Sequence, residues 1–461
     1  MTPAEIFRGL ERACGIAALP MPAFDGADPI LPTPFRAASA AAAALGLGAA
    51  CACEIAGCAG QAVSVALPAA AASLLSFSIL RLGGRALPRP SETNPAVSFY
   101  RCGDGRWIYI HGGFPHLERG LLDLLGAENT REALSAAIAK WNAFELEDEI
   151  AARGLCGAVA RTAVEWRASP QGAALRDTPA IRLTRIGDAP PVKAMKADAP
   201  LAGIRVLDLT RVLAGPTAGR TLASYGADVL SIRAPHLPTF DVFDVDTGSG
   251  KRSAYLDLRD GKDLRRLRAL LGDAHVFVDS YRPGALAGYG LSPDALAQIR
   301  PGIVHVAVSC YGHDGPWAAR GGWEQLGQTA TGLALAQGAF LRAGEPRLIP
   351  AAACDYITGY LAAAGALAAL LRRRREGGSW RVEVSLCATA MWLQSCGRVD
   401  AASVPRSWDP LAGSGEYRQS CMTGRGRLDC LGPVVRMSQT PPAWTCPPPA
   451  PGADEPVWRQ P

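Results

Sequence analysis

The sequence lacks an uninterrupted apolar run long enough to cross a membrane, and it lacks the charge excess of a nucleic-acid-binding protein. Residues 37–52 are alanine-rich but are followed by Glu54, and residues 63–80 contain Pro68 and several serines. Because a membrane helix needs about 20 consecutive apolar residues, we interpret both segments as buried helix and strand. The net charge of +5 over 461 residues is modest, although it suits a ligand that carries phosphates. We therefore expect neither a membrane nor a nucleic acid as a partner.

The sequence also lacks the cysteine spacing of a disulfide framework or of a zinc site. Its 13 cysteines are an odd number, and no apolar signal-like core follows residues 1–8. Cys51, Cys53 and Cys58 cluster without a C-x-x-C pair or a nearby histidine, which favours small core residues over metal ligands. We expect reduced thiols in a cytoplasmic protein, and no metal.

Apolar residues are plentiful, at 49%, while only 19% of the residues are charged. This composition is typical of a well-packed α/β protein with a large core and two or three domains. We expect a degenerate helix–strand repeat of the large domain over 1–93, a small α+β domain over 94–190, a linker over 191–200, a large domain with its closing strand over 201–439, and a proline-rich tail over 440–461.

The second half predicts a doubly wound, parallel, Rossmann-like sheet. We expect strands at 204–209, 228–232, 254–258, 275–279 and 303–309, with helices at 217–225, 263–271 and 292–299. Strand, helix and strand at this spacing form right-handed βαβ units. The first turn, at 214–219, lacks the G-x-G-x-x-G spacing, and the second strand ends in Arg233 where NAD sites carry an acid. We therefore exclude NAD.

The first half predicts two strands within 98–111, joined by a turn at Asp104 and Gly105, and then helices over 116–125, 131–140 and 145–153. A faint internal repeat also links the two halves. Residues 62–67 match residues 381–386, an offset of 381 − 62 = 319, and an alanine-rich segment precedes each stretch. In that register Asp355 is matched by Arg36, so the first copy lacks the carboxylate.

The most informative segment is 350–359, which contains Asp355 and runs directly into the alanine- and leucine-rich stretch 360–374. We expect Asp355 on a tight Thr-Gly turn at the mouth of a buried helix. A helix N-terminus has unpaired N–H groups and partial positive charge, and it favours an anion held there. Such a place keeps a carboxylate ionised, dry and nucleophilic. The simpler interpretation is an N-cap.

Several motifs, in this order and spacing, resemble the family III CoA-transferases, the group of formyl-CoA transferase and carnitine CoA-transferase. They include Leu-Ala-Gly-Ile-Arg-Val-Leu-Asp-Leu at 201–209, Tyr-Gly-Ala-Asp-Val at 225–229, Ser-Tyr-Arg-Pro-Gly at 280–284, Gly-His-Asp-Gly-Pro at 312–316 and Asp-Tyr-Ile-Thr-Gly at 355–359. The resemblance covers about residues 200–398. The small-domain module precedes the large domain here, whereas it follows that domain in the family.

The resemblance implies a CoA-transferase in which Asp355 attacks an acyl-CoA thioester, and CoA then passes to an organic acid through an anhydride and an aspartyl-CoA thioester. Glu324 would be a second catalytic acid that orients the acyl group or tunes Asp355. Trp323 stands where the racemase branch has a histidine, and an indole cannot shuttle a proton. A non-catalytic CoA- or acyl-CoA-binding relative is the main alternative, with a racemase or hydrolase behind it.

The resemblance also implies that CoA and acyl-CoA are substrates and that no cofactor stays bound. It assigns the cationic contacts to Lys251, Arg252 and Arg282, and the lining of the nucleotide to Val212, Leu213, Ala214, Ser280 and Tyr281. Where the family has an arginine before Pro235, this chain has Ala234, with Arg233 shifted by one, and a strand residue shifted by one faces the other way. The family implies a homodimer, interlocked or not.

Overall fold

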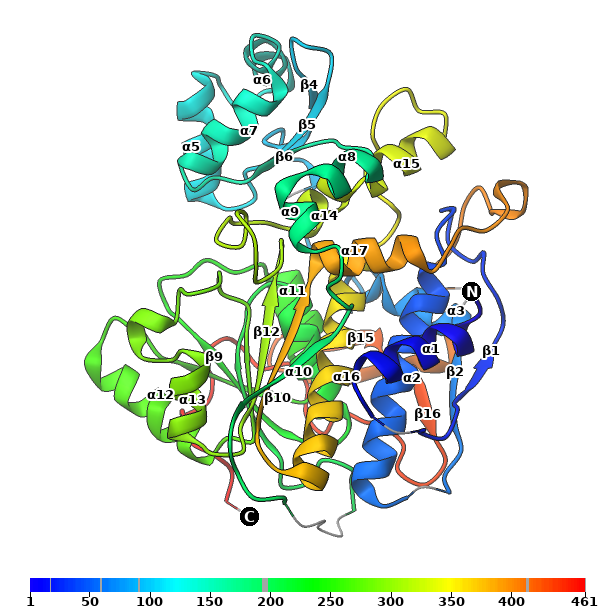
Figure 1. The fold of residues 1–461 in the computed structure, drawn as a ribbon, viewed down its shortest axis with the longest axis vertical. Helices are drawn as coiled ribbons and strands as arrows, with labels where there is room; N and C mark the ends of the chain where they lie inside the picture. Colours follow the sequence, from blue (N-terminus) through cyan, green and yellow to red (C-terminus); the bar gives the residue numbers. More distant parts are fainter. Residues whose placement is uncertain (17, 59, 90–91, 193–197, 412–413, 461) are drawn as a thin grey trace.

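The computed structural model describes residues 1–461 except residues 17, 59, 90–91, 193–197, 412–413 and 461. Part of the predicted linker, 193–197, lies outside the described residues. In Figure 1 a small domain lies at the top, and the large sheet with its helices lies below it. The N-terminal segment, in blue, lies beside the sheet. The molecule therefore has three parts: the small domain, the large domain and the N-terminal segment.

A seven-stranded sheet forms the middle of the large domain. Its strands are β7 (Arg182–Gly187), β8 (Arg205–Leu209), β9 (Asp228–Arg233), β10 (Lys251–Tyr255), β11 (Val276–Asp279), β12 (Val304–Ser309) and β13 (Ser379–Ser385). They lie in the order β10-β9-β8-β11-β12-β13-β7. All neighbours pair in parallel except β7, which is antiparallel to β13.

Helices cover both faces of this sheet, so the predicted doubly wound fold is confirmed. α10 (Ala214–Ser224) and α16 (Ala353–Glu376) lie on one face, and α12 (Gly261–Asp273) and α13 (Pro293–Ile299) lie on the other. The large domain also contains α11 (Asp241–Gly248), α14 (Glu324–Thr331), α15 (Leu333–Phe340) and α17 (Leu386–Ser395). Val206 on β8 belongs to the core shared with α10 and α16, and its neighbour Leu207 belongs to the core under α12. The alternation follows from the two-residue period of a strand.

One strand differs from the prediction. The segment expected at 254–258 forms β10 at Lys251–Tyr255. Residues after Leu256 turn away because Asp257 accepts a hydrogen bond from the Arg259 backbone (3.1 Å) and Asp260 caps α12. Aspartates that bind nearby backbone N–H groups favour turns over strands.

The small domain contains an antiparallel sheet of β4 (Val97–Arg101), β5 (Trp107–His111) and β6 (Gly157–Val159). Helices α5 (Pro115–Leu125), α6 (Arg131–Ile138) and α7 (Ala143–Ala152) pack on it, and the short helices α8 (Ala163–Ala168) and α9 (Pro170–Ala174) lead back to the large domain. The tip of the β4–β5 hairpin has Gly105 in the left-handed region at φ 83°, which glycine adopts without strain.

The N-terminal segment repeats one edge of the large domain on a smaller scale. It contains α1 (Pro3–Ala13), β1 (Ala23–Asp25), α2 (Ala37–Ala56), β2 (Val63–Ala66), α3 (Leu67–Ser73), α4 (Ser76–Ile79) and β3 (Arg81–Leu82). β1 and β2 pair in parallel as β12 and β13 do, and α2 packs along α16 in the core. A short helix follows each strand, beginning at Leu67 and at Leu386.

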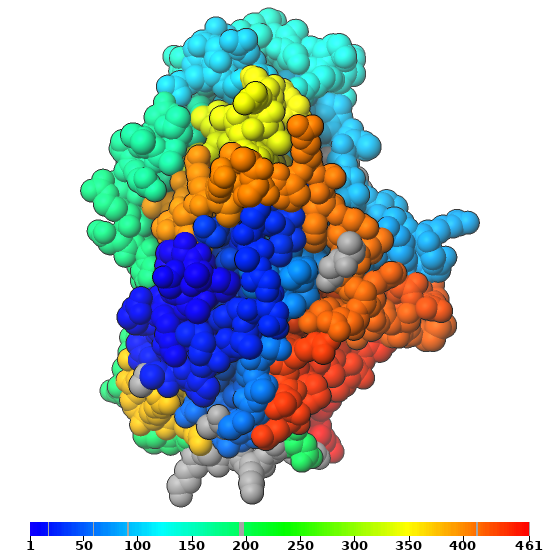
Figure 2. Space-filling model, turned by 90° about the vertical axis from the view of Figure 1, so that its right-hand side faces the viewer, coloured from blue at the N-terminus to red at the C-terminus, as the bar shows by residue number. Residues whose placement is uncertain are grey.

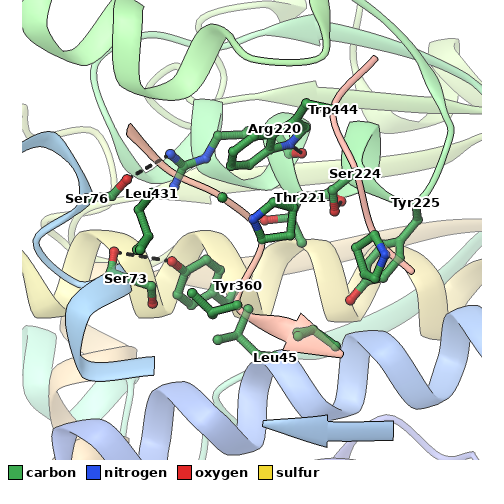
Figure 3. Close-up of a pocket in the computed structure, with 15 residues that line it drawn as sticks. Leu45, Ser73, Ser76, Arg220, Thr221, Ser224, Tyr225, Tyr360, Leu431 and Trp444 are labelled. Carbon is green, nitrogen blue, oxygen red and sulfur yellow. Dashed lines mark hydrogen bonds between the residues drawn. The ribbon is translucent and has the colours of Figure 1, made fainter. Parts of the chain in front are cut away.

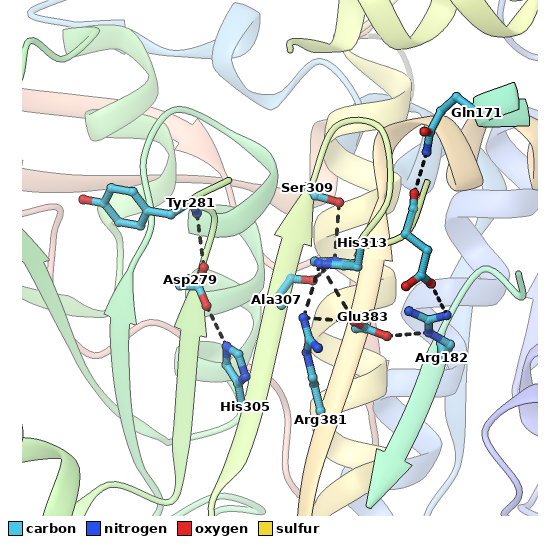
Figure 4. A network of polar contacts seen from close by, with 11 residues as sticks. Gln171, Arg182, Asp279, Tyr281, His305, Ala307, Ser309, His313, Arg381 and Glu383 are labelled. Atoms are coloured by element: carbon cyan, nitrogen blue, oxygen red, sulfur yellow. Dashed lines mark hydrogen bonds and ion pairs between the residues drawn. The ribbon is translucent and has the colours of Figure 1, made fainter. Parts of the chain in front are cut away.

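The two repeats exchange their closing strands. β7, which follows the small domain, pairs with β13 of the second repeat. β16 (Val435–Met437), which follows the hairpin β14 (Arg418–Thr423) and β15 (Gly426–Leu431), pairs with β2 of the first. Figure 4 shows the first junction, where Arg182 of β7 pairs with Glu383 of β13. Arg182 also pairs with Asp314 (2.6 Å). Each repeat is therefore completed by the other, and in Figure 2 the blue N-terminal segment lies against the orange and red C-terminal one.

Residues 441–460 run as an extended arm over the large domain. Gly250 N donates to Cys446 O (2.9 Å), and the indole N–H groups of Trp444 and Trp458 donate to Arg220 O and Leu270 O (3.1 Å each). Because β10 is the last strand of the sheet, this arm covers an edge that would otherwise expose unpaired backbone groups.

Two helices, α2 and α16, are long and apolar enough to cross a membrane by length and composition. In the structure 89% and 94% of their apolar windows are buried inside the protein. Each therefore serves as a core helix of this fold, and the two pack against one another. All 13 cysteines are free thiols.

Candidate functional site

A cavity of about 300 Å³ lies between the small domain and the carboxyl-terminal ends of the sheet strands. The large domain contributes the loops after β8, β11 and β12, together with Trp323, Asp355 and Leu386. The small domain contributes Phe114, His116, Leu117, Gly154 and Cys156. Open α/β sheets bind ligands outside the carboxyl ends of their strands, and this cavity has that position.

Asp355 lies in the first turn of α16, which begins at Ala353. The expected turn at Thr358 and Gly359 is wrong, because both residues lie inside the helix. Gly359 instead allows a close approach: a Cβ there would stand 2.6 Å from Ala214 O and 2.6 Å from the Thr217 side chain. The helix therefore presses against the start of α10, and this contact brings Asp355 to the loop after β8.

The N-cap interpretation of Asp355 is not supported by this geometry. The N-cap residue is Ala352, and no side chain of the helix caps its own N-terminus. Within the described part of the chain, the Asp355 carboxylate takes part in no hydrogen bond or ion pair. Carboxylates deep in a protein are normally paired, so a free one that faces a cavity is a candidate functional group.

The surroundings of Asp355 move the pKa of its carboxyl group close to neutral pH. Burial raises its pKa from 3.8 to about 7. The side chain is only partly covered because it faces the cavity, yet it lies deep in the molecule, and the low polarity around it penalises the charged form. An acid with a pKa near 7 can be ionised at neutral pH while remaining weakly solvated, which suits a nucleophile.

Glu324, at the start of α14, caps α16 from outside. Its Oε1 accepts hydrogen bonds from Cys354 N (2.7 Å) and from Gln328 Nε2 (3.0 Å). Burial, and then the charge of Asp355, raise the pKa of Glu324 well above its usual range. This direction favours the neutral form of Glu324 and the location of the negative charge on Asp355. Unlike Asp355, it lies behind the cavity wall rather than in it.

Two thiols also face the cavity, Cys156 and Cys310. Burial raises the pKa of Cys156 to about 11 and that of Cys310 well above its usual range. Because the thiolate is the reactive form of cysteine, neither competes with Asp355 as a nucleophile at neutral pH.

The backbone around the cavity is strained at two positions. Val212, in the loop after β8, has φ 71°, and Ala351, just before α16, has φ 76°. A β-branched residue rarely adopts this region, and strain of this kind gathers at functional sites. Both segments carry a residue of the predicted site or lie next to one.

Six of the predicted CoA contacts meet in this cavity: Val212, Leu213, Ala214, Ser280, Tyr281 and Arg282 all line it. The loops that carry them are tied together, since Arg211 N donates to Ser280 Oγ (3.3 Å). Figure 4 shows how the second loop is anchored: Tyr281 N donates to Asp279 (3.2 Å), and Asp279 is bonded to His305 (2.6 Å). The strand ends thus hold the predicted contacts in place.

The two other predicted cations lie elsewhere. Lys251 is buried in an ion pair with Asp208 (2.7 Å) and donates to Pro216 O. Arg252 pairs with Asp228 (3.0 Å) and donates to the tail at Val457 O. Arg233, the shifted arginine, pairs with Asp244 (2.7 Å). All three charges are compensated inside the protein, so we leave them out of the site.

Arg211 is a cation at the cavity that the prediction did not include. It lines the cavity, stacks on the Phe114 ring at 5.3 Å and donates to Pro238 O. Neither Arg211 nor Arg282 forms an ion pair among the described residues. The signal was present, because Arg211 directly precedes Val212. Phe114, Leu117 and Cys156 had no such signal, since only the packing of the small domain brings them here.

A second cavity, of about 40 Å³, lies where α10, α16 and α2 meet the segment 431–444 (Figure 3). Its one arginine is compensated: Arg220 pairs with Asp246 (3.0 Å) and bonds Ser76 (3.2 Å). This cavity offers a ligand neither a free charge nor the space for an acyl chain, so the larger cavity is the candidate site.

Comparison with known families gives a match over most of the chain. The model described as CoA-transferase family III matches residues 33–195 and 201–414. The first range contains most of the N-terminal segment and the small domain, and the second contains most of the large domain.

Among curated proteins, acetyl-coenzyme A transferase nodX of Hypoxylon pulicicidum is 31% identical over 327 residues, which cover 66% of this chain and 55% of that protein. Succinyl-CoA:glutarate CoA-transferase of Mus musculus is 30% identical over 202 residues, 41% of this chain and 46% of that protein. The solved structure of Rv3272 from Mycobacterium tuberculosis is 31% identical, with a TM-score of 0.40, over 43% of this chain and 59% of that chain. The chain spans about half the length of the curated relatives it matches.

Proposed function

The chain belongs to CoA-transferase family III, and on that premise we propose that it moves CoA from an acyl-CoA to an organic acid with Asp355 as the nucleophile. One observation carries the proposal. A half-buried carboxylate with a pKa of about 7, and with no partner among the described residues, faces a cavity between two domains. The other groups of that cavity suit the two ends of an acyl-CoA.

The first half of the reaction begins when an oxygen of ionised Asp355 attacks the thioester carbonyl carbon. The carbon–sulfur bond breaks, CoA leaves as a thiolate, and the acyl group remains as a mixed anhydride with Asp355. The thiolate then attacks the Asp355 carbonyl of that anhydride. The donor acid leaves as a carboxylate, and CoA is held as a thioester of Asp355.

The second half reverses these steps with another acid. The acceptor carboxylate attacks the Asp355 thioester, which releases the thiolate and forms a second anhydride. The thiolate attacks the acceptor carbonyl and regenerates the Asp355 carboxylate. One thioester replaces another, so the exchange needs no ATP. Because water would hydrolyse either anhydride, the covered position of Asp355 under the small domain supports this use of the site.

Glu324 acts in this proposal as a positioning residue. Protonated, it holds the first turn of α16 through Cys354 N while adding no second negative charge to the cavity. Trp323, the residue before it, cannot act as an acid or base near neutral pH, which disfavours a racemase.

Arg211 and Arg282 are the proposed contacts for the CoA phosphates. A guanidinium binds phosphate oxygens with two parallel hydrogen bonds, and these two lack carboxylate partners among the described residues. Tyr281, in the loop after β11, lines the cavity and is the proposed contact for the adenine. If the following test fails, the alternative is a protein that binds CoA without catalysis.

The test traps the covalent intermediate. The protein is incubated with an acyl-CoA and then with hydroxylamine, and the peptides are analysed by mass spectrometry. A hydroxamate is expected on Asp355, since hydroxylamine attacks both the anhydride and the thioester. The control omits the acyl-CoA. An unmodified Asp355 across a broad panel of acyl-CoAs would leave only the binding function.

The oligomeric state and the compartment stay predictions. The family implies a homodimer, and the exchanged strands of this chain make a single-chain state the alternative. The molar mass in solution, measured by light scattering, decides between the two. The cytoplasmic location rests on the free thiols alone.

A further inference from the structure

The N-terminal segment contacts the helix turn that carries Asp355. Residues 74–77, which join α3 to α4 and which we call the 74–77 segment, lie against the start of α16. Leu74 O accepts a hydrogen bond from Ala352 N (3.1 Å). Phe77 N donates to the hydroxyl group of Tyr356 (3.1 Å). The segment therefore binds the chain on both sides of Asp355.

The first of these contacts joins two helix ends. Leu74 is the C-cap residue of α3, and Ala352 is the N-cap residue of α16. The last carbonyl groups and the first N–H groups of a helix have no partner inside that helix, so each group here satisfies the other. The preceding residue, Ala351, has φ 76°. A strained residue keeps its conformation only where the surrounding structure holds it, and Leu74 O holds the next amide group.

The second contact belongs to a buried network. The Tyr356 hydroxyl donates to the carboxylate of Asp246 on α11 (2.8 Å). Asp246 also accepts a hydrogen bond from Ser76 Oγ and pairs with Arg220 (3.0 Å). Figure 3 shows Arg220 directed at Ser76. Because Tyr356, Ser76 and Asp246 are all buried, one hydroxyl group ties the first turn of α16 to α11 and to the 74–77 segment.

The start of α2 has a backbone contact of the same kind but lacks the hydroxyl group. There Val399 N, which follows α17, donates to Pro34 O (2.9 Å). Counted from the first helical residues, Tyr356 is matched by Ala40. A backbone contact from the other repeat thus accompanies both helices, so folding explains it. The tyrosine is found at the helix that carries Asp355, and this difference points to a role in the site.

We propose that Tyr356, held by the 74–77 segment, is a positioning residue that keeps Asp355 directed into the cavity. This inference rests on the proposed function, in which a carboxylate oxygen must meet a thioester carbon. A misplacement of about 1 Å can lower a reaction rate by about a hundredfold. Asp355 and Tyr356 are neighbours in the first turn of α16, so a turn that loses its hold on the hydroxyl group shifts the carboxylate as well.

Tyr356→Phe tests the proposal, because it removes only the hydroxyl group. We expect kcat for CoA exchange to fall by about 10- to 30-fold. The dissociation constant of free CoA, measured by titration calorimetry, should stay within about twofold of the wild type, since the proposed CoA contacts lie in the loops after β8 and β11. A loss of kcat without a loss of affinity is not the effect of partial unfolding, and thermal melts report the folded fraction.

Tyr360→Phe is the matched control. It removes another buried hydroxyl group from α16, one that makes a longer hydrogen bond to Ser73 O of the N-terminal segment (3.4 Å). Tyr360 lies one turn beyond Tyr356 and outside the turn that carries Asp355. This variant should keep kcat within about twofold of the wild type.

A second measurement does not depend on turnover. Amide hydrogen exchange is followed by mass spectrometry on the full-length protein without substrate. Peptides that cover 350–358 contain Ala352 N and Cys354 N, which are both bonded from outside the helix. Tyr356→Phe should speed deuterium uptake there by about fivefold or more, because local opening becomes easier. Tyr360→Phe should leave this uptake unchanged.

The outcomes separate this inference from the proposed function. Unchanged uptake in Tyr356→Phe overturns the inference, whether or not the wild type transfers CoA. A wild-type kcat in Tyr356→Phe also overturns it and leaves the transferase intact, and so do equal losses in the two tyrosine variants. A wild type without exchange activity rejects the proposed function, and faster uptake in Tyr356→Phe alone then still upholds the hold on the first turn.

Discussion

The two long alanine-rich helices of this chain have nearly the same surroundings but different first turns. α2 and α16 are both buried, pack along each other, and lead into a strand and a short helix. Their N-cap residues, Arg36 and Ala352, have nearly identical backbone angles, with φ −80° and ψ 53° against φ −84° and ψ 56°. Neither has a side-chain cap of its own, so each start needs an outside carboxylate.

The two helices differ in the number of acids at their first turns. Asp28 accepts from Ser39 N at the start of α2 (2.9 Å), and Glu324 accepts from Cys354 N at the start of α16 (2.7 Å). One acid completes each helix. Only α16 then adds a second acid, Asp355, with no partner among the described residues. The capping acid meets the structural need, and the extra carboxylate is therefore unexplained by folding.

Aligning the helix starts also refines the repeat. Counted from the first helical residues, Ala37 and Ala353, Asp355 is matched by Ser39; counted from the short helices that begin at Leu67 and Leu386, it is matched by Arg36. The two counts differ because β13 has seven residues and β2 has four. Neither alignment gives the first repeat a carboxylate.

The largest expected difference between the two helices is in CoA exchange, and the matched variants Asp355→Ala and Ser39→Ala test it. Loss of the nucleophile should lower CoA exchange by at least about a thousandfold, while Ser39→Ala should leave exchange near the wild-type rate. Exchange is followed by chromatography of the two acyl-CoAs. The CoA dissociation constant of Asp355→Ala should stay within about threefold of the wild type. A collapse of affinity would make Asp355 a structural residue.

The capping acids give the next largest effect. Glu324→Ala removes the acceptor for Cys354 N and should lower kcat by about 30- to 100-fold, because the first turn of α16 loses its position. Glu324→Gln keeps an acceptor oxygen and mimics the protonated acid, so it should recover most of the rate. If both variants lose equal activity, Glu324 has a proton-dependent role beyond positioning. The kcat and KM of each variant, measured at pH 7, decide this.

Replacing an unpaired arginine should weaken CoA binding more than replacing a paired one, and this difference should be smaller than the effects above. Arg211→Ala should weaken CoA binding by about tenfold, since one charge-assisted phosphate contact contributes roughly 1.5 kcal/mol. Arg252→Ala, the control, removes an arginine already paired with Asp228 and should change the affinity by less than about twofold. Calorimetry at fixed ionic strength measures both. A larger loss with Arg252→Ala would restore the contacts assigned from the resemblance.

The fold and half of the site could be predicted from the sequence because they depend on local patterns. The strands around 205–209 and 276–279 and the loops after them follow from βαβ periodicity, and the residues 212–214 and 280–282 follow with them. Lys251 and Arg252 show the limit. Their charges suit phosphate, but their carboxylate partners, Asp208 and Asp228, lie more than 20 residues away in the sequence. The domain contacts of Phe114 and the exchanged strands are likewise set only by tertiary packing.

The smallest expected effect is on the free energy of unfolding, and the raised pKa of Asp355 fixes its sign. The pKa of Asp355 is about 7 in the folded protein and 3.8 as the ordinary value. Between these values the unfolded chain loses its proton while the folded chain keeps it, so rising pH destabilises the fold until about pH 7.

Asp355→Asn removes this penalty. It should raise the free energy of unfolding by about 1 to 2 kcal/mol at pH 8, or about 1–2 °C in Tm, and by much less at pH 4. Thermal melts at both pH values, with Ser39→Ala alongside, measure this. A neutral or negative shift at pH 8 would mean that the carboxylate stabilises the fold, and the contrast between α16 and α2 would then be structural rather than functional.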